Sequence, residues 1–301
     1  MLVGDMLPTL RQLHYLSLLA EHGSFSRAAE AAHVTQPTLS AGIAELEKVL
    51  GAPVVDRSRG GVILTDVGRE ASIRAETLLT GAEDLVQAAR AAGRPLNGRL
   101  RLGVIPTIAP YLLPKALPRL RERYPDLKLY LREDLTQKLV AALRAGSLDA
   151  ALVALPYDMH GLDWAHVTDD ELLAAAPASH PIAQTDAVTP AALDQGDLIL
   201  LEDGHCLRDH ALSACGLTAP KGAGGAFAAT SLPTLVQMVG SGLGVSFLPA
   251  MAVRGGLTDG ASIAIRPIAA DHPSREVVVC WRKGSARAVE GRLLAEVFRE
   301  G

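Results

Sequence analysis

The segment that most restricts how this chain can fold is SFSRAAEAAHVTQPTLSAGIAELEKVLG, residues 24–51. Small side chains at Ala28, Ala29 and Ala32 allow two helices to cross closely around a short turn. The second of these helices carries an apolar stripe with steps of four, three and four residues, which places one face in a core: Leu39, Ile43, Leu46 and Leu50. The pattern predicts a helix-turn-helix bundle within residues 1–66.

The face of the second helix opposite this stripe is polar. Gln makes paired contacts to adenine, and Ser or Thr bonds to bases or phosphates. A β-hairpin is predicted next, over VVDRSRGGVILT, and its arginines would meet a DNA backbone or minor groove. The candidate DNA contacts are Gln36, Pro37, Thr38, Ser40, Arg57 and Arg59. The alternative, a plain helical packing module, does not explain why crossing, polar face and basic hairpin occur together.

Bulk charge does not support DNA binding. The whole chain carries a formal net charge of −4. The bases of the first 60 residues are Arg11, Arg27, Lys48, Arg57 and Arg59, and the acids are Asp5, Glu21, Glu30, Glu45, Glu47 and Asp56. The prediction therefore rests on local geometry.

Residues 67–96 are predicted to form a long linker helix and a short Gly- and Pro-containing link. Apolar residues recur in steps of four and three: Ala71, Ala75, Leu78, Ala82, Leu85, Ala89 and Ala92. Such a heptad seam is typical of a dimerisation helix, with Leu78 and Leu85 as its large side chains. The alternative is a helix packed on its own domain.

From residue 97 to residue 301, strand-like and helix-like segments alternate. The strand candidates include RLRLGVI, LKLYLRE, LDAALVAL and EVVVCW, with helical segments such as LTQKLVAALRAG between them. This alternation predicts an α/β regulatory domain with a largely parallel sheet. About 200 residues are generous for one lobe, so we expect two lobes, the second at about residues 169–272.

The stretch LLEDGHCLRDHALSAC holds two of the three cysteines, Cys206 and Cys215. A neighbouring His or Arg, or a helix N-terminus near Leu207, is expected to lower the pKa of Cys206 and favour the reactive thiolate. If the segment is helical, nine residues separate the cysteines by roughly 13 Å, whereas a disulfide needs α-carbons within about 7 Å. A disulfide would therefore require the helix to unwind. The alternative is two unrelated core cysteines, the role expected for Cys280.

The first 66 residues resemble the winged helix-turn-helix of LysR-type transcription regulators, from AEHGSFSRAAEAAHV to RGGVILTDVG. The resemblance implies a linker helix and a two-lobed α/β effector domain like that of periplasmic binding proteins. It also implies a homodimer or homotetramer that binds promoter DNA and works with RNA polymerase. Ala41 departs from the family, where many members have a DNA-contacting Arg.

The motifs around Cys206, IPTIAPYLLP and ATSLPTLVQMVGSGLG resemble the peroxide-sensing member of this family. The resemblance implies that Cys206 reacts with hydrogen peroxide, that Cys215 resolves it as a disulfide, and that a cellular thiol reductant reverses the reaction. The implied peroxide pocket consists of Thr107, Thr136, His205, Leu207, Arg208, Asp209 and Arg275. Gln137 departs from the pattern, since the best-known members have His there.

Three other functions compete with this interpretation. A small organic effector between the lobes is the main alternative, because threonines there could bind a carboxylate. A thiol peroxidase enzyme does not account for the DNA-binding unit, and a solute-binding protein would need an export signal. We expect a cytoplasmic protein that is not an enzyme, has no membrane partner, and needs neither cofactor nor metal, since no CxxC or paired His occurs at zinc-ligand spacing.

Overall fold

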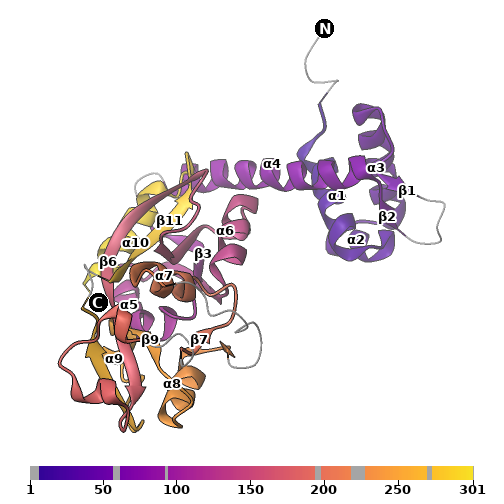
Figure 1. Cartoon of the computed structure of the whole chain (residues 1–301). Helices are drawn as coiled ribbons and strands as arrows, with labels where there is room; N and C mark the ends of the chain where they lie inside the picture. The colour runs from indigo at the N-terminus through magenta and orange to yellow at the C-terminus, as the bar shows by residue number, and fades with distance from the viewer. Residues whose placement is uncertain are drawn as a thin grey trace. The chain divides into compact units, whose positions relative to one another are not determined.

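The computed structural model describes residues 7–56, 62–91, 94–193, 198–217, 228–269 and 273–300. The chain divides into two compact units, residues 1–90 with 144–147 and residues 91–143 with 148–301 (Figure 1). Within the described ranges, no helix is long and apolar enough to cross a membrane.

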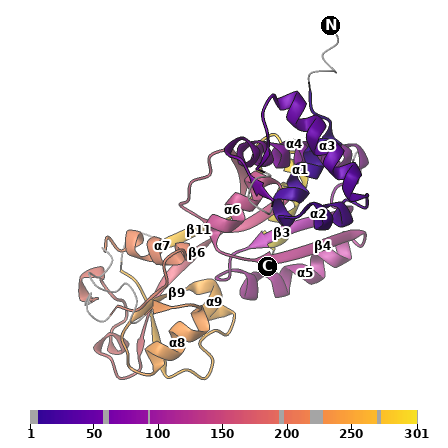
Figure 2. The same cartoon turned by 90° about the vertical axis from the view of Figure 1, so that its right-hand side faces the viewer.

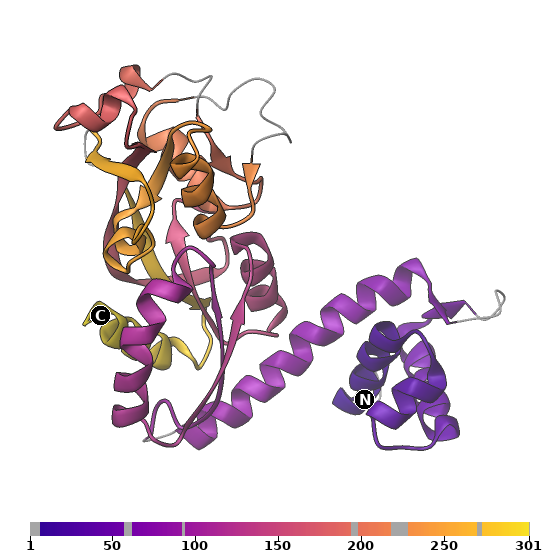
Figure 3. The same ribbon diagram turned by 90° about the horizontal axis from the view of Figure 1, so that it is seen from below.

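Three short helices, a hairpin and one long helix make up the first unit. They are α1 (Leu10–His22), α2 (Phe25–Ala31), α3 (Gln36–Leu50), β1 (Val55–Asp56), β2 (Ile63–Leu64) and α4 (Asp66–Ala91). The strands β1 and β2 pair antiparallel. The α4 helix is continuous and extends well past the three-helix core (Figure 3).

The core of this unit forms where the sequence predicts it, with one exception. Ala28 and Ala29 are buried at the helix crossing, and Leu39 and Ile43 are inaccessible to solvent. The prediction for Leu50 is wrong: its side chain is 39% exposed. It lies in the last turn of α3 and faces an open groove between α1 and α4 in place of the closed core.

The second unit contains the α/β regulatory domain. Its elements are β3 (Gly98–Val104), α5 (Ala109–Arg123), β4 (Leu127–Glu133), α6 (Thr136–Ala145), β5 (Ala150–Leu155), β6 (Leu162–Pro177), β7 (Leu200–Leu201), α7 (Cys206–Ala214), β8 (Ala228–Ala229), α8 (Leu232–Gly240), β9 (Ser246–Pro249), α9 (Ala250–Arg254), β10 (Ile263–Pro267), β11 (Ser274–Arg282) and α10 (Ala288–Arg299), with short 3-10 turns at Pro181–Gln184 and Pro190–Ala192.

The prediction of a largely parallel sheet is wrong. In the order β10-β6-β11-β5-β3-β4, only β3 pairs parallel, with β4 and β5. The strand β6 pairs antiparallel with β9, β10 and β11, and β11 also pairs antiparallel with β5. The physical reason is the length of β6, a single 16-residue strand that continues from one lobe into the other. The later strands β9, β10 and β11 pair with it in the opposite direction.

The second unit has two lobes (Figure 2). Each lobe has an apolar core of its own. Lobe I is built on β3, β4 and β5 with α5, α6 and α10, and lobe II on β9 and β10 with α8 and α9. The helix α7 contributes to both, because Cys206 packs in the core of lobe I whereas Leu207 and Ala211 pack in the core of lobe II.

Candidate functional site

The helix α7 presents the two cysteines to different cores. Cys206 is its first residue and is buried against lobe I, while Cys215 follows its last turn and is buried in lobe II. All three cysteines are free thiols. The helix places the cysteine α-carbons roughly 13 Å apart, nine residues at about 1.5 Å each, which is too far for a disulfide.

The electrostatics of Cys206 differ from the sequence-based expectation. Burial raises the pKa of the Cys206 thiol, and the opposing effects of Arg275 and the Thr136 hydroxyl do not reverse that direction. The expectation of a lowered pKa is therefore wrong. The hydration free energy that a thiolate would lose in this core is larger than the stabilisation that Arg275 and Thr136 give it. Burial also lowers the pKa of His205, so this imidazole supplies no cation to the thiol.

A buried guanidinium connects the lobes beside the thiol. Arg275 donates from Nη1 to Thr107 Oγ1 at 2.7 Å and from Nη2 to the Thr107 carbonyl at 3.1 Å. It also donates to Asp170 Oδ2 from Nε at 3.1 Å and from Nη2 at 2.9 Å, and both side chains of this ion pair are inaccessible to solvent. The other Asp170 oxygen accepts from the Met251 amide in the first turn of α9 at 2.8 Å.

Asp170 is a site residue that sequence reasoning missed. In the run VTDDELL it is indistinguishable from Asp169, whose side chain is exposed. Only the register of β6 against β11, which pairs Asp170 with Arg275, selects one carboxylate of the two.

A very small cavity lies next to Cys206. It leaves about 10 Å³ for the centre of a water-sized molecule, which is about what a single water needs. Its lining residues are Ile105, Pro106, Thr107, Leu135, Thr136, Gly204, His205 and Cys206. The hydroxyl oxygen of Thr136 is buried and has no hydrogen-bond partner of ordinary geometry among the described residues. The cavity therefore offers a polar group to a molecule about the size of water.

Four residues of the expected pocket do not line this cavity. Arg275 contacts the lining residue Thr107 instead. Leu207 packs in the core of lobe II, Arg208 forms an ion pair with Asp203, and Asp209 is exposed. Asp209 acts on Cys206 only through its charge, which raises the pKa of the thiol.

The expected DNA-contacting side chains of α3 lie together at its first turn. Gln36, Pro37 and Thr38 are exposed and Ser40 is half-buried. Ser26 donates to Gln36 Oε1 at 3.1 Å, so the amide is held in place by the preceding helix. Arg57 and Arg59 lie outside the described residues.

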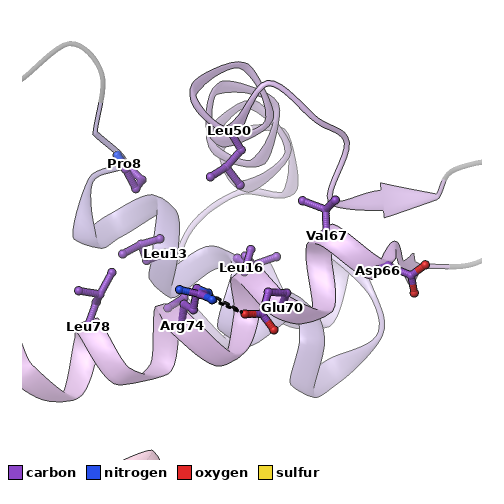
Figure 4. Close-up of a pocket in the computed structure, with 11 residues that line it drawn as sticks. Pro8, Leu13, Leu16, Leu50, Asp66, Val67, Glu70, Arg74 and Leu78 are labelled. Carbon is purple, nitrogen blue, oxygen red and sulfur yellow. Dashed lines mark hydrogen bonds and ion pairs between the residues drawn. The ribbon is translucent and has the colours of Figure 1, made fainter.

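The expected dimerisation seam of α4 divides into two parts. Ala71 and Ala75 pack against the three-helix core of their own unit, so this part of the seam is not free to meet a partner. Leu78 and Leu85 are 55% and 72% exposed. Leu78 lines an apolar groove of about 500 Å³ with Leu13, Leu16 and Leu50; Glu70 and Arg74 pair at its edge, 2.7 Å apart (Figure 4).

Comparison with known proteins identifies the family. The lysR family of bacterial regulatory helix-turn-helix proteins matches residues 10–69, and the LysR substrate binding domain matches residues 93–301. The chain belongs to the LysR family. It is a DNA-binding transcription regulator by family, which is not a family of enzymes.

Several relatives of this LysR-family chain carry peroxide-related names. The transcriptional dual regulator OxyR of Escherichia coli is 38% identical over 96% of this chain and 94% of its own. A full-length OxyR variant from Pseudomonas aeruginosa is 36% identical, with a TM-score of 0.77 over 97% of this chain and 98% of that one. The regulator EstR of Acinetobacter baylyi is 39% identical over 97% of both chains. The chain is thus an OxyR-like LysR regulator.

Proposed function

We propose that this regulator senses hydrogen peroxide by oxidation of Cys206, followed by a disulfide with Cys215. The observation that carries the proposal is the water-sized cavity at Cys206, with the buried Thr136 hydroxyl beside the thiol. An OxyR mutant of Corynebacterium glutamicum bound to H2O2 has a TM-score of 0.65 to this chain at 33% identity, over 98% of this chain and 92% of that one.

The first chemical step breaks the O–O bond. The Cys206 thiol gives up its proton, its sulfur attacks one peroxide oxygen, and the other leaves as hydroxide and takes the proton to become water. Arg275 holds the Thr107 hydroxyl oxygen, so the hydroxyl hydrogen can donate to a molecule in the cavity. The guanidinium of Arg275 is permanently charged and lies one hydrogen bond from the Thr107 hydroxyl. It therefore stabilises the negative charge that develops on the leaving oxygen.

The second step joins the two cysteines. The Cys215 sulfur attacks the Cys206 sulfenic acid, a disulfide forms, and water leaves. Since intact α7 keeps the α-carbons too far apart, the helix must unwind and both thiols must leave their cores. Oxidation is thereby coupled to a rearrangement of both lobes.

We further propose how the regulator binds DNA, how its copies associate and which partners it needs. Gln36, Thr38 and Ser40 contact bases, with Pro37 in the same turn, and Arg57 and Arg59 contact the DNA backbone. The exposed Leu78 and Leu85 join two copies in a homodimer or homotetramer. RNA polymerase and a thiol reductant are the other partners.

A small organic effector is the second candidate, and the EstR relative, whose name does not mention peroxide, leaves it open. The cavity at Cys206 argues against it at this position, because drug-sized ligands need on the order of 300 Å³ or more. An effector would have to bind elsewhere and leave the thiols reduced.

A thiol count after one equivalent of hydrogen peroxide separates the two functions. The parent should fall from three free thiols to one, with a linked peptide pair of Cys206 and Cys215 in the mass spectrum. Cys206→Ser should abolish the response, because a serine hydroxyl is a poor nucleophile toward peroxide. Cys215→Ser should stop at sulfenic or over-oxidised Cys206, and Cys280→Ser should match the parent. If micromolar peroxide leaves both thiols free, the proposal fails.

A further inference from the structure

His210 is a buried side chain of α7 whose role no sequence motif indicates. It lies one helical turn after Cys206 and is only 4% exposed. Its Nε2 is 2.9 Å from the carbonyl oxygen of Pro156, directly after β5 of lobe I. A carbonyl can only accept, so Nε2 carries the hydrogen, and in the neutral ring Nδ1 is a bare acceptor. That nitrogen is buried and has no partner among the described residues.

The position of His210 on α7 gives this bond its consequence. Residues four apart share one face of a helix, and here that face, with Cys206 and His210, points to lobe I. Leu207, Ala211 and Cys215 pack in lobe II instead. The hydrogen bond of His210 therefore ties α7 to the chain at the end of a lobe I strand.

We propose that His210 is a positioning residue, a latch that fastens the first turns of α7 to lobe I and so holds Cys206 in its cavity. The bond from Nε2 to the Pro156 carbonyl must break before Cys206 can reach Cys215. This inference rests on the proposed function, since the latch opposes the same unwinding that disulfide formation requires.

The electrostatic surroundings keep the latch neutral. Burial lowers the pKa of His210, and Arg275 on β11 lowers it further, while the Pro156 carbonyl and Asp209 on α7 raise it. Cys206, one turn earlier on α7, is a neutral thiol because burial raises its pKa. A proton on Nδ1 would be a buried charge with no acceptor, so the ring keeps one hydrogen, on Nε2.

Two substitutions separate the hydrogen bond from the bulk of the side chain. His210→Leu removes the N–H group that donates to the Pro156 carbonyl. His210→Gln retains a side-chain N–H donor at a similar distance from the backbone. In the reduced protein, the backbone amides of α7 should exchange about fivefold to tenfold faster in H210L than in the parent, as expected for one lost buried hydrogen bond. H210Q should stay within about twofold of the parent. Conversion of the sulfenic acid to the disulfide should follow the same order, with H210L fastest.

The matched control is Val236→Ala, which opens a small cavity in lobe II without touching the latch. It should lower the melting temperature and leave the relative protection of α7 unchanged. If H210L protects α7 as the parent does, or if V236A loosens α7 as much as H210L, the latch is refuted.

Nitrogen NMR of the parent provides a test that needs no variant. In the reduced protein His210 should be the Nε2–H tautomer, and its ring should titrate at lower pH than a solvated imidazole, because burial lowers its pKa. After oxidation, the midpoint of the His210 titration should move up toward about pH 6.5, the value of a solvated imidazole. An ordinary titration in the reduced state would overturn the proposal. The reduced-state measurements need no peroxide, so they stand even if Cys206 proves unreactive and the proposed function fails.

Discussion

Replacing Asp170 with Asn tests its buried ion pair with Arg275, whose guanidinium also holds Thr107 at the cavity beside Cys206. Both partners are inaccessible to solvent, so water cannot screen the guanidinium once the carboxylate is gone. Removing one partner of such a pair costs about 3 to 5 kcal/mol. Because the amide oxygen of the new side chain can still accept a hydrogen bond, we expect a loss near the lower end, about 3 kcal/mol.

Thermal unfolding measures this loss. For a domain of this size each kcal/mol corresponds to about 2–4 °C, so the melting temperature of the regulatory domain should fall by about 6 to 12 °C. The matched control is Asp169→Asn, the exposed neighbour, which should change it by no more than about 1 °C. Equal melting temperatures for D170N and D169N would refute the reasoning.

The same variant has a chemical readout. Asp170 neutralises Arg275, and Arg275 is the neighbour that most lowers the pKa of Cys206. With the carboxylate gone, the pKa of Cys206 should fall, and alkylation of this thiol should begin at lower pH than in the parent. If the pH dependence of alkylation is the same in D170N and in the parent, the charge of Arg275 has no effect on the pKa of Cys206.

Three further predictions concern other parts of the chain. Gln36→Ala should weaken binding to a specific site far more than to random DNA, whereas Arg57→Ala should weaken both and reduce the salt dependence; equal losses for Q36A on both sequences in a fluorescence titration would exclude base readout. Leu85→Asp should shift the oligomer toward monomer in light scattering because it would bury an unpaired charge, and an unchanged mass would mean that Leu85 stays exposed. Cys280, whose pKa burial raises to about 12, should resist alkylation at pH 8 in the folded protein; labelling as fast as Cys206 would contradict its burial.

The helical parts of the fold could be predicted from sequence because their signals are local. The stripe at Leu39, Ile43 and Leu46 and the small residues at the helix crossing all lie within a few turns of one another. The prediction for Leu50 was wrong because the exposure of its side chain depends on how closely α1 and α4 pack against the end of α3. The sheet direction failed because alternation of strands and helices does not reveal that β6 continues through both lobes.

The sequence by itself determined the cysteine pair, its spacing on one helix and the polar turn of α3, since residues near in sequence have almost no freedom to be elsewhere. Tertiary structure decided the rest of the site. The hydrogen bond of His210 reaches a carbonyl 54 positions away, and that of Arg275 reaches Thr107 across 168. Burial raised the pKa of Cys206 against its charged neighbours. Desolvation depends on everything that packs around an atom, and no local pattern of residues contains it.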